Sequence, residues 1–445
     1  MIKKALFIVT PAFGHVSASF GIAKILKENG YKIVYFISNN YQNFVTTHGY
    51  DVFLTDSLPI GLNLDLDVEI YYNNKSYLEK LKDSVNETVY EKRKNHLLHA
   101  FMQIKPSAVF LDSAFTSADF IILYNKLREQ KTKLFFIQTQ LSSKNSPGTP
   151  YIDSAYSPEQ TFHVAIEKII RKLKNLLKRL KLRIIYLGYD DISMIYAHIK
   201  SENIPSRYGL DKDNYFYWGF KNIPEIITSP VELEFNNYSK KHNQHYLGLF
   251  EPESQALEAD FLEKTIGQTH KSLVYISFGT QYMNELDTVK NFLLKIDTIL
   301  DDKHDLIGIL SLGNNNMKFD IEFRNIKICS FIPQVYLLKY CKFFITHGGL
   351  NSVKEAINSC VPMLVYPVKG DMVGTSRKVK EKGLGICGDL HLDSMQEIKQ
   401  KFDYLIASQD IIRKKLTEFK SIVDKNYQAE KVLMNIVDND GYIIH

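Results

Sequence analysis

Residues 343–371 read FFITHGGLNSVKEAINSCVPMLVYPVKGD, and the order of the patterns in this segment indicates the fold class. It opens with an apolar run at 343–346, typical of a buried strand, which leads straight into a His-Gly-Gly turn at 347–349. Residues 353–358 have helical spacing, and a second apolar run follows at 363–366. A strand, a helix and a further strand in this order form a β-α-β unit, which predicts a parallel sheet covered by helices.

The glycine turn and the helix after it have the properties of an anion-binding site. Glycines let the backbone turn tightly and approach a ligand, while a new helix presents unpaired N–H groups and the positive end of its dipole. A diphosphate is suited to this position. His347, Asn351 and Ser352 can donate further hydrogen bonds, and Glu355 lies one turn further on, where it can accept from ribose hydroxyls. In the alternative interpretation the turn is purely structural and an Asn or Ser caps the helix.

The same alternation of short apolar runs and helical patterns occurs twice along the 445 residues. In the first half the expected strands are 5–9, 33–37, 109–111 and 134–137, with helices at 17–29 and 118–128. In the second half the expected strands are 273–278, 306–310, 326–329, 343–346 and 363–366. Continuous apolar strands separated by helices indicate a parallel sheet buried on both faces, so the sequence predicts an α/β protein with two doubly wound domains.

The expected domain boundaries follow from a polar, proline-containing stretch near the middle of the chain. We expect an N-terminal domain over 1–225, a linker over 226–245 and a C-terminal domain over 246–420. A last helical segment, 421–445, is expected to pack back across the junction of the two domains.

The composition is that of a globular protein and excludes several classes. Hydrophobic residues make up 45% and charged residues 24%, which argues against disorder, and a formal charge of +5 is too small to indicate nucleic-acid binding. The four cysteines form no C-x-x-C pair and no metal-ligand spacing, so we expect reduced, mostly buried thiols. The first apolar run is too short for a signal peptide, and no run reaches the roughly 18 apolar residues of a membrane span. The sequence therefore predicts a cytoplasmic protein.

A second candidate site follows the first expected strand. Residues 11–15 read PAFGH, which places His15 just before the helix that is expected to begin near Ser17. Asp112 ends the strand 109–111, and in open α/β sheets such strand ends face the same ligand crevice. An imidazole near neutrality can take a proton from a hydroxyl, and a carboxylate beside it would orient the ring and stabilise its charged form. The alternative is that His15 has only a structural role.

Together, these motifs resemble the donor-site signature of family 1 glycosyltransferases, the UDP-glycosyltransferase superfamily that includes bacterial macrolide and plant natural-product transferases. The residues that carry the resemblance are FIPQ at 331–334, FITHGG-x-NS-x-x-E at 344–355, PVKGD at 367–371, PAFGH at 11–15 and YISFGT at 275–280. The resemblance implies the GT-B fold, in which two Rossmann-like domains face each other across a cleft. The N-terminal domain would hold the acceptor and the C-terminal domain the nucleotide.

The resemblance also implies donor-binding roles for individual residues. Phe331 would stack on the nucleotide base, and Gln334 with Glu355 would hold the ribose. The residues expected around the diphosphate are Thr280, His347, Gly349, Asn351 and Ser352. Asp371 would bind sugar hydroxyls, but Met372 stands where the family usually has a glutamine. This departure fits either a donor with fewer hydroxyls, such as a deoxysugar, or UDP-glucose with the contact supplied elsewhere, and we favour UDP-glucose.

The implied reaction is an inverting transfer of a sugar, most often glucose in this family, from a UDP-sugar to a hydroxyl of an apolar small-molecule acceptor. His15 would be the general base and Asp112 its partner. No cofactor and no metal is expected, because a helix N-terminus and His347 can neutralise the diphosphate. The sequence lacks G-x-G-x-x-G after the first strand, which disfavours an NAD-dependent enzyme, and it lacks the P-loop motif. A non-catalytic nucleotide-binding protein of the same fold is the alternative from another class, and the presence of both His15 and Asp112 argues against it.

Residues 165–186 form a strongly basic amphipathic pattern. Apolar residues recur at helical spacing, and eight Lys or Arg side chains follow between 168 and 183 without an acidic residue. One interpretation is a helix that covers the acceptor pocket and keeps its basic face in water. The other is a helix that lies peripherally on the inner face of the membrane, in which case the acceptor would be a lipid or a carotenoid-like molecule.

Overall fold

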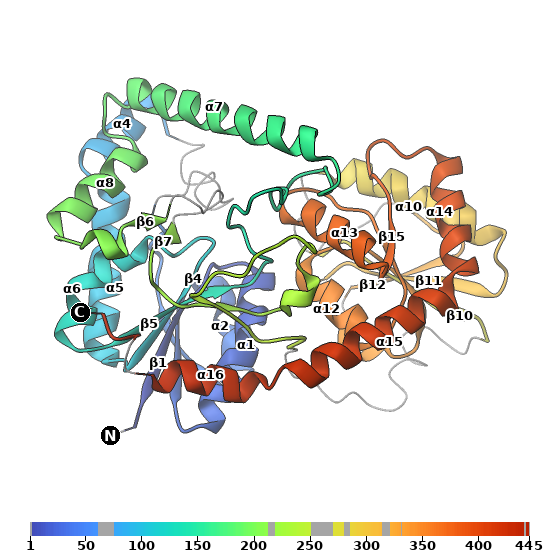
Figure 1. Cartoon of the computed structure of the whole chain (residues 1–445), viewed down its shortest axis with the longest axis horizontal. Helices are drawn as coiled ribbons and strands as arrows, with labels where there is room; N and C mark the ends of the chain where they lie inside the picture. Colours follow the sequence, from blue (N-terminus) through green and yellow to red (C-terminus); the bar gives the residue numbers. More distant parts are fainter. Residues whose placement is uncertain are drawn as a thin grey trace.

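The computed structural model describes residues 2–60, 75–211, 219–250, 270–279, 285–313, 321–330, 332–439 and 442–444. Within these residues the chain forms two α/β domains, each built around one parallel sheet (Figure 1). The prediction of two doubly wound α/β domains is therefore confirmed.

The first domain has a seven-stranded parallel sheet in the order β3-β2-β1-β4-β5-β8-β9. Its strands are β1 (Lys4–Ile8), β2 (Lys32–Ile37), β3 (Asp51–Leu54), β4 (Ala108–Asp112), β5 (Lys133–Gln138), β8 (Glu225–Ile227) and β9 (Gln244–Tyr246). Its helices are α1 (Phe13–Glu28), α2 (Gln42–Thr46), α4 (Tyr77–Val85), α5 (Thr88–Ile104), α6 (Asp119–Glu129), α7 (Thr161–Ile185) and α8 (Asp191–Ser201). A small antiparallel pair, β6 (Leu210–Asp211) and β7 (Gly219–Phe220), lies outside the main sheet.

Strand β1 shows why these apolar runs become central strands. Leu6 and Ile8 belong to the apolar cluster on one face of the sheet, while Ala5 and Phe7 belong to the cluster on the other face. Alternate side chains of a strand point to opposite faces, so an uninterrupted apolar run is stable only where helices cover both sides.

The range 226–245, which the sequence analysis assigns to a linker, lies within the first domain. It begins inside β8 and ends inside β9, and β8 pairs in parallel with both β5 and β9. Ile226 and Ile227 are fully buried, and they supply the apolar contacts that a strand at this position requires. The chain therefore leaves the first sheet only after Tyr246.

The second domain has a six-stranded parallel sheet in the order β12-β11-β10-β13-β14-β15. Its strands are β10 (Ser272–Ser277), β11 (Leu306–Ser311), β12 (Ile326–Cys329), β13 (Cys341–Thr346), β14 (Met363–Val365) and β15 (Gly385–Cys387). Its helices are α10 (Leu286–Asp301), α11 (Gln334–Leu338), α12 (Leu350–Asn358), α13 (Asp371–Lys382), α14 (Met395–Ala407) and α15 (Gln409–Asn426). All four cysteines lie in this domain as free thiols, but only Cys341 is fully buried, so the expectation that most are buried is wrong.

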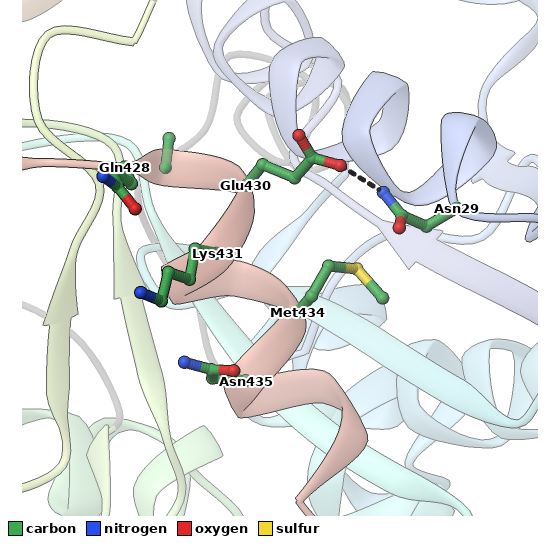
Figure 2. Close-up of a pocket in the computed structure, with 7 residues that line it drawn as sticks. Asn29, Gln428, Glu430, Lys431, Met434 and Asn435 are labelled. Carbon is green, nitrogen blue, oxygen red and sulfur yellow. Dashed lines mark hydrogen bonds between the residues drawn. The ribbon is translucent and has the colours of Figure 1, made fainter.

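The last helix, α16 (Ala429–Asp438), returns to the first domain and packs beside α1 (Figure 1). Leu433, Ile436 and Val437 join the apolar cluster of the first domain. Figure 2 shows Glu430 at the start of this helix accepting a hydrogen bond of 3.0 Å from the side-chain amide of Asn29, beside an open surface pocket of about 570 Å³. No helix in the described part of the chain is both long enough and apolar enough to cross a bilayer.

Helices α12 and α13 of the second domain make buried polar contacts with the first. The Nζ atom of Lys354 donates to the backbone oxygen of Thr228 at 2.6 Å. Lys378 forms an ion pair of 2.9 Å with Glu234, and each side chain is only 2% exposed. Such buried charges are tolerated because each has a partner. These contacts fix the position of both helices against the first domain.

Candidate active site

Each sheet has one point at which the strand order reverses direction. In the first sheet this point lies between β1 and β4, and in the second it lies between β10 and β13. Ligands of open α/β sheets bind at the carboxyl ends of the strands at such a point. His15 follows β1, Asp112 is the last residue of β4, and the His-Gly-Gly turn follows β13, so the two candidate sites lie at these two points.

The structure brings His15 and Asp112 together. The His15 Nδ1 atom lies 2.6 Å from the Asp112 carboxylate, and Asp112 is fully buried. Helix α1 begins at Phe13, so His15 lies in its first turn and not before the helix as expected from the sequence. The expected start near Ser17 is wrong because the residue that precedes the helix is Ala12, which makes no side-chain capping bond.

Further contacts orient the side chains of His15 and Asp112. Asp112 accepts a backbone N–H bond of 3.0 Å from Ala114, and the Thr139 hydroxyl lies 2.9 Å from His15 Nδ1. Burial alone would raise the pKa of Asp112, but the adjacent His15 and the backbone N–H bonds from Ala114 and Thr10 lower it below its usual value. An ionised Asp112 can only accept a hydrogen bond, so this contact favours the His15 tautomer with its proton on Nδ1, in which Nε2 is the basic nitrogen. The sequence analysis did not find Thr139, because the end of β5 gave no motif.

The second crevice is shaped by the His-Gly-Gly turn. Gly348 has a φ of +80°, and a Cβ atom there would lie 2.7 Å from the side chain of Val365. Helix α12 begins at Leu350, earlier than the expected 353, with Gly349 as its N-cap and no capping side chain. The alternative in which an Asn or Ser caps the helix is therefore wrong. The first N–H groups of α12 therefore have no side-chain cap.

The imidazole of His347 fits between two glycines. A Cβ atom at Gly349 would lie 2.6 Å from Nε2 of the ring, and one at Gly279 would lie 2.8 Å from it. Burial lowers the pKa of His347 to about 4, although a hydrogen bond to the Ser277 oxygen acts in the opposite direction. The ring is thus neutral near pH 7. Because Nδ1 donates to the Ser277 oxygen at 3.4 Å, the Nε2 atom of the neutral ring has no proton to donate, and the ring lacks the positive charge that would neutralise a diphosphate.

A polar cluster forms where the ribose contacts are expected. The Nε2 atom of Gln334 donates to Glu355 at 2.5 Å and to the Ser352 hydroxyl at 3.1 Å, and its Oε1 accepts from Tyr275 at 3.3 Å. Residues from the start of α11 and from the first turns of α12 therefore meet on one side of the crevice. Tyr275 lies on β10 and could not be assigned to the cluster from the sequence.

The two candidate sites face each other. The side-chain amide of Asn351, in the first turn of α12, donates 3.0 Å to the backbone oxygen of Gly14, in the first turn of α1. Burial raises the pKa of Asp371, and the proximity of His15 acts to lower it. Asp371 thus lies within electrostatic reach of the His15 ring. The side chain of Met372 is 8% exposed and belongs to the apolar core of the second domain.

Two predicted site residues, Thr280 and Phe331, lie outside the described residues. Within the described ranges, no group of three or more His, Cys, Asp or Glu side chains has the arrangement of a metal site. Lys354 was missed by the sequence analysis, although it lies on α12 next to the predicted residues, because its partner Thr228 is far away in the sequence.

Comparison with known proteins identifies the family to which this chain belongs. The family model described as UDP-glucoronosyl and UDP-glucosyl transferase matches residues 63–418. The NDP-glycosyltransferase YjiC of Bacillus subtilis (strain 168) is 21% identical over 397 residues, which cover 88% of this chain and 86% of that protein.

Solved structures share the fold. The glycotransferase of kitacinnamycin has a TM-score of 0.66 at 15% identity and covers 98% of this chain and 99% of that chain. The spinosyn rhamnosyltransferase SpnG, solved in complex with thymidine diphosphate, has a TM-score of 0.62 at 11% identity over 98% of this chain and 100% of that chain. These likenesses confirm the GT-B fold. The chain is a nucleotide-sugar-dependent glycosyltransferase, and it belongs to the UDP-glucuronosyl and UDP-glucosyl transferase family.

Proposed function

We propose that the protein is an inverting transferase that moves glucose from UDP-glucose to a hydroxyl of an apolar small-molecule acceptor. The observation that supports this most strongly is the buried His15–Asp112 pair, held opposite the N-terminus of α12 by the bond between Asn351 and Gly14. Displacement of a nucleoside diphosphate by a hydroxyl in one step requires two parts. One is a base, here on the first domain, and the other is a group that stabilises the leaving anion, here the helix N-terminus on the second domain.

In the proposed mechanism, Nε2 of His15 takes the proton of the acceptor hydroxyl. The oxygen attacks the anomeric carbon, the bond to the diphosphate breaks, and the configuration at that carbon inverts. The charge that develops on the departing diphosphate is stabilised by the N–H groups at the start of α12. Asp112 stabilises the imidazolium that forms on His15.

The proposed donor site needs no metal ion. Asn351 and Ser352 donate hydrogen bonds to the diphosphate beside the neutral ring of His347, and Gln334 with Glu355 holds the ribose. Thr280 and Phe331 complete the site at the diphosphate and the base, and Asp371 accepts from the sugar hydroxyls. The enzyme would act in the cytoplasm, in agreement with four free cysteines.

Replacing Glu355 with alanine should weaken UDP binding about 10- to 100-fold, because a hydrogen bond to a charged group contributes about 1.5–3 kcal/mol. Gln334→Ala should have a smaller effect, since it removes a neutral partner of Glu355 and Ser352. Titration calorimetry with UDP measures both. Glu418→Ala, on the exposed surface of α15, is the control. Unchanged affinity in Glu355→Ala would mean that this cluster does not bind the nucleotide.

Met372→Gln should leave kcat/KM for UDP-glucose unchanged or slightly raised. The Met372 side chain packs in the apolar core, so the new amide would be buried and should lower the free energy of unfolding by about 1–3 kcal/mol. Met372→Leu keeps the apolar contacts and serves as the control. Steady-state kinetics and thermal unfolding check both effects. A sharp fall in activity with UDP-glucose, together with strong wild-type activity on a deoxysugar donor, would contradict the proposed donor.

The direct test of the proposed function is a screen of donors against acceptors, read by mass spectrometry. A product heavier by one hexose with UDP-glucose and an apolar alcohol or phenol supports the proposal. The absence of transfer with every nucleotide-sugar, despite UDP binding, would favour the alternative of a non-catalytic nucleotide-binding protein.

A second candidate keeps the chemistry and changes the acceptor to a membrane lipid or a carotenoid-like molecule. The observation that favours it is the surface of α7, whose apolar side chains are exposed.

A further inference from the structure

Helix α7 turns its apolar face to the outside and not to the protein core. An amphipathic surface helix normally turns its apolar face to the core, yet Val164 is the one residue of α7 that is fully buried. The apolar side chains along its opposite face are 39–74% exposed. This exposed set, called the α7 stripe, comprises Ile166, Ile169, Ile170, Leu173, Leu176, Leu177, Leu180 and Ile184.

The edge of α7 that contacts the protein is polar. Lys168 donates to the side chain of Asn145 at 2.7 Å and to the backbone oxygen of Ser146 at 2.8 Å. Arg171 pairs with Asp153 and with Glu167. Lys168 and Arg171 are three residues apart and therefore lie on one side of the helix. The interpretation in which α7 covers a pocket with its apolar face is thus wrong, because its basic residues hold the protein and its apolar residues face outward.

The orientation of α7 is fixed at both ends. Arg171 and Lys168 attach the first half of the helix, and the Tyr77 hydroxyl donates 2.5 Å to the backbone oxygen of Ile185 at the other end. Figure 1 shows α7 along the outer edge of the molecule, above α4 and α8 at one end. Leu78 on α4 and Leu187, which follows α7 in the sequence, also have exposed apolar side chains.

Basic side chains border the α7 stripe on both sides. With about 100° of rotation per residue, Lys172, Arg179 and Arg183 lie along one border. Lys174, Lys178 and Lys181 lie along the other border. No acidic residue follows Glu167 in the helix. An apolar stripe between two cationic rows matches the acyl boundary and the headgroups of an anionic bilayer, whereas two copies of α7 placed face to face would bring charges of like sign together.

We propose that α7 is an interfacial helix that docks the enzyme on an anionic lipid surface, with the α7 stripe at the acyl boundary and the two basic rows at the headgroups. This docking goes beyond the proposed transfer reaction and does not require it, since the contact is made by α7 alone. The helix would lie in the plane of the surface over its length of about 37 Å.

The test is co-sedimentation of the full chain with vesicles, without substrate. Wild type should pellet with vesicles of phosphatidylglycerol and phosphatidylcholine but not with phosphatidylcholine alone, and less at high salt. Lys172→Gln with Lys178→Gln and Arg179→Gln should weaken partitioning about 100-fold. Leu173→Gln with Leu177→Gln and Leu180→Gln should also abolish binding, and because these side chains are exposed the variant should keep wild-type UDP affinity.

The matched control removes three exposed charges from the other side of the molecule, with Lys414→Gln, Lys425→Gln and Lys431→Gln on α15 and α16. It should bind vesicles like wild type. The proposal is overturned if wild type does not bind anionic vesicles, or if the α7 and control variants lose binding equally. Sedimentation velocity without lipid tests whether a second copy of the chain covers the α7 stripe instead. That alternative would be correct if wild type is a dimer, the leucine variant is a monomer, and neither binds vesicles.

Discussion

Replacing His15 with alanine should reduce sugar transfer by about 10⁴-fold, the upper end of the effect of a general base. The variant loses the proposed general base, and residues 9–15, which follow β1, contain no second histidine. UDP binding should persist, because the proposed diphosphate contacts lie on the second domain. Initial rates measured by product mass, and calorimetry with UDP, separate the two effects.

The matched control for this variant is His99→Ala, at an exposed position of α5 in the same domain. It should retain wild-type kinetics. Normal turnover in His15→Ala would show that another group takes the proton, and loss of both turnover and UDP binding would show that the variant disturbs the fold at the contact between Gly14 and Asn351.

Asp112→Asn should lower kcat by about 10²–10⁴-fold while KM for the donor stays close to that of wild type. An amide at this position presents either its oxygen or its NH₂ group to His15 Nδ1. It cannot supply the negative charge that stabilises the imidazolium. It also cannot keep both acceptor oxygens, of which one receives the Ala114 N–H and the other the His15 ring.

The readout that identifies this role is the pH profile of kcat/KM. The Asp112 carboxylate favours the protonated form of His15, so its removal should move the pH at which activity appears to a lower value, since a less basic imidazole loses its proton earlier as the pH rises. Asp56→Asn, at an exposed position paired with Lys92, is the control. If Asp112→Asn has the wild-type rate and the wild-type pH profile, Asp112 has only a structural role at the end of β4.

The parts of the fold that were predicted correctly are those that the apolar pattern alone determines. The central strands β1, β4, β10 and β13 are continuous apolar runs, and burial on both faces is what such runs require. Strand β9 reads Gln-His-Tyr and was missed, because its pairing with β8 is set by the sheet and not by local propensity. The starts of α1 and α12 were placed too late, since Ala12 and Gly349 carry no capping side chain for the sequence to reveal.

In the candidate site too, some residues could be predicted from the sequence and others could not. His15 and Asp112 could be paired from the sequence because parallel strands end at one edge of a sheet. Thr139 and Lys354 could not be found, since their partners are distant in sequence. The low pKa of His347 depends on its position between Gly279 and Gly349, which only the folded chain reveals. For α7 the spacing of apolar residues predicted the helix. The direction of its apolar face could not be predicted, because it depends on the contacts of Lys168 with Asn145 and of Arg171 with Asp153.

The close approach of α13 to the first domain limits how this enzyme can be recombined with its relatives. The Gly374 N–H donates 2.9 Å to the backbone oxygen of Ile152, and a Cβ atom at 374 would lie 2.0 Å from that oxygen. A chimera that exchanges the acceptor half would therefore have to bring in a partner loop that tolerates the same contact. It would also have to preserve Glu234 opposite Lys378. These contacts between the domains are preserved when three segments come from the same parent. The segments are the 145–154 loop, η3 (Val231–Leu233) with the following Glu234, and α13.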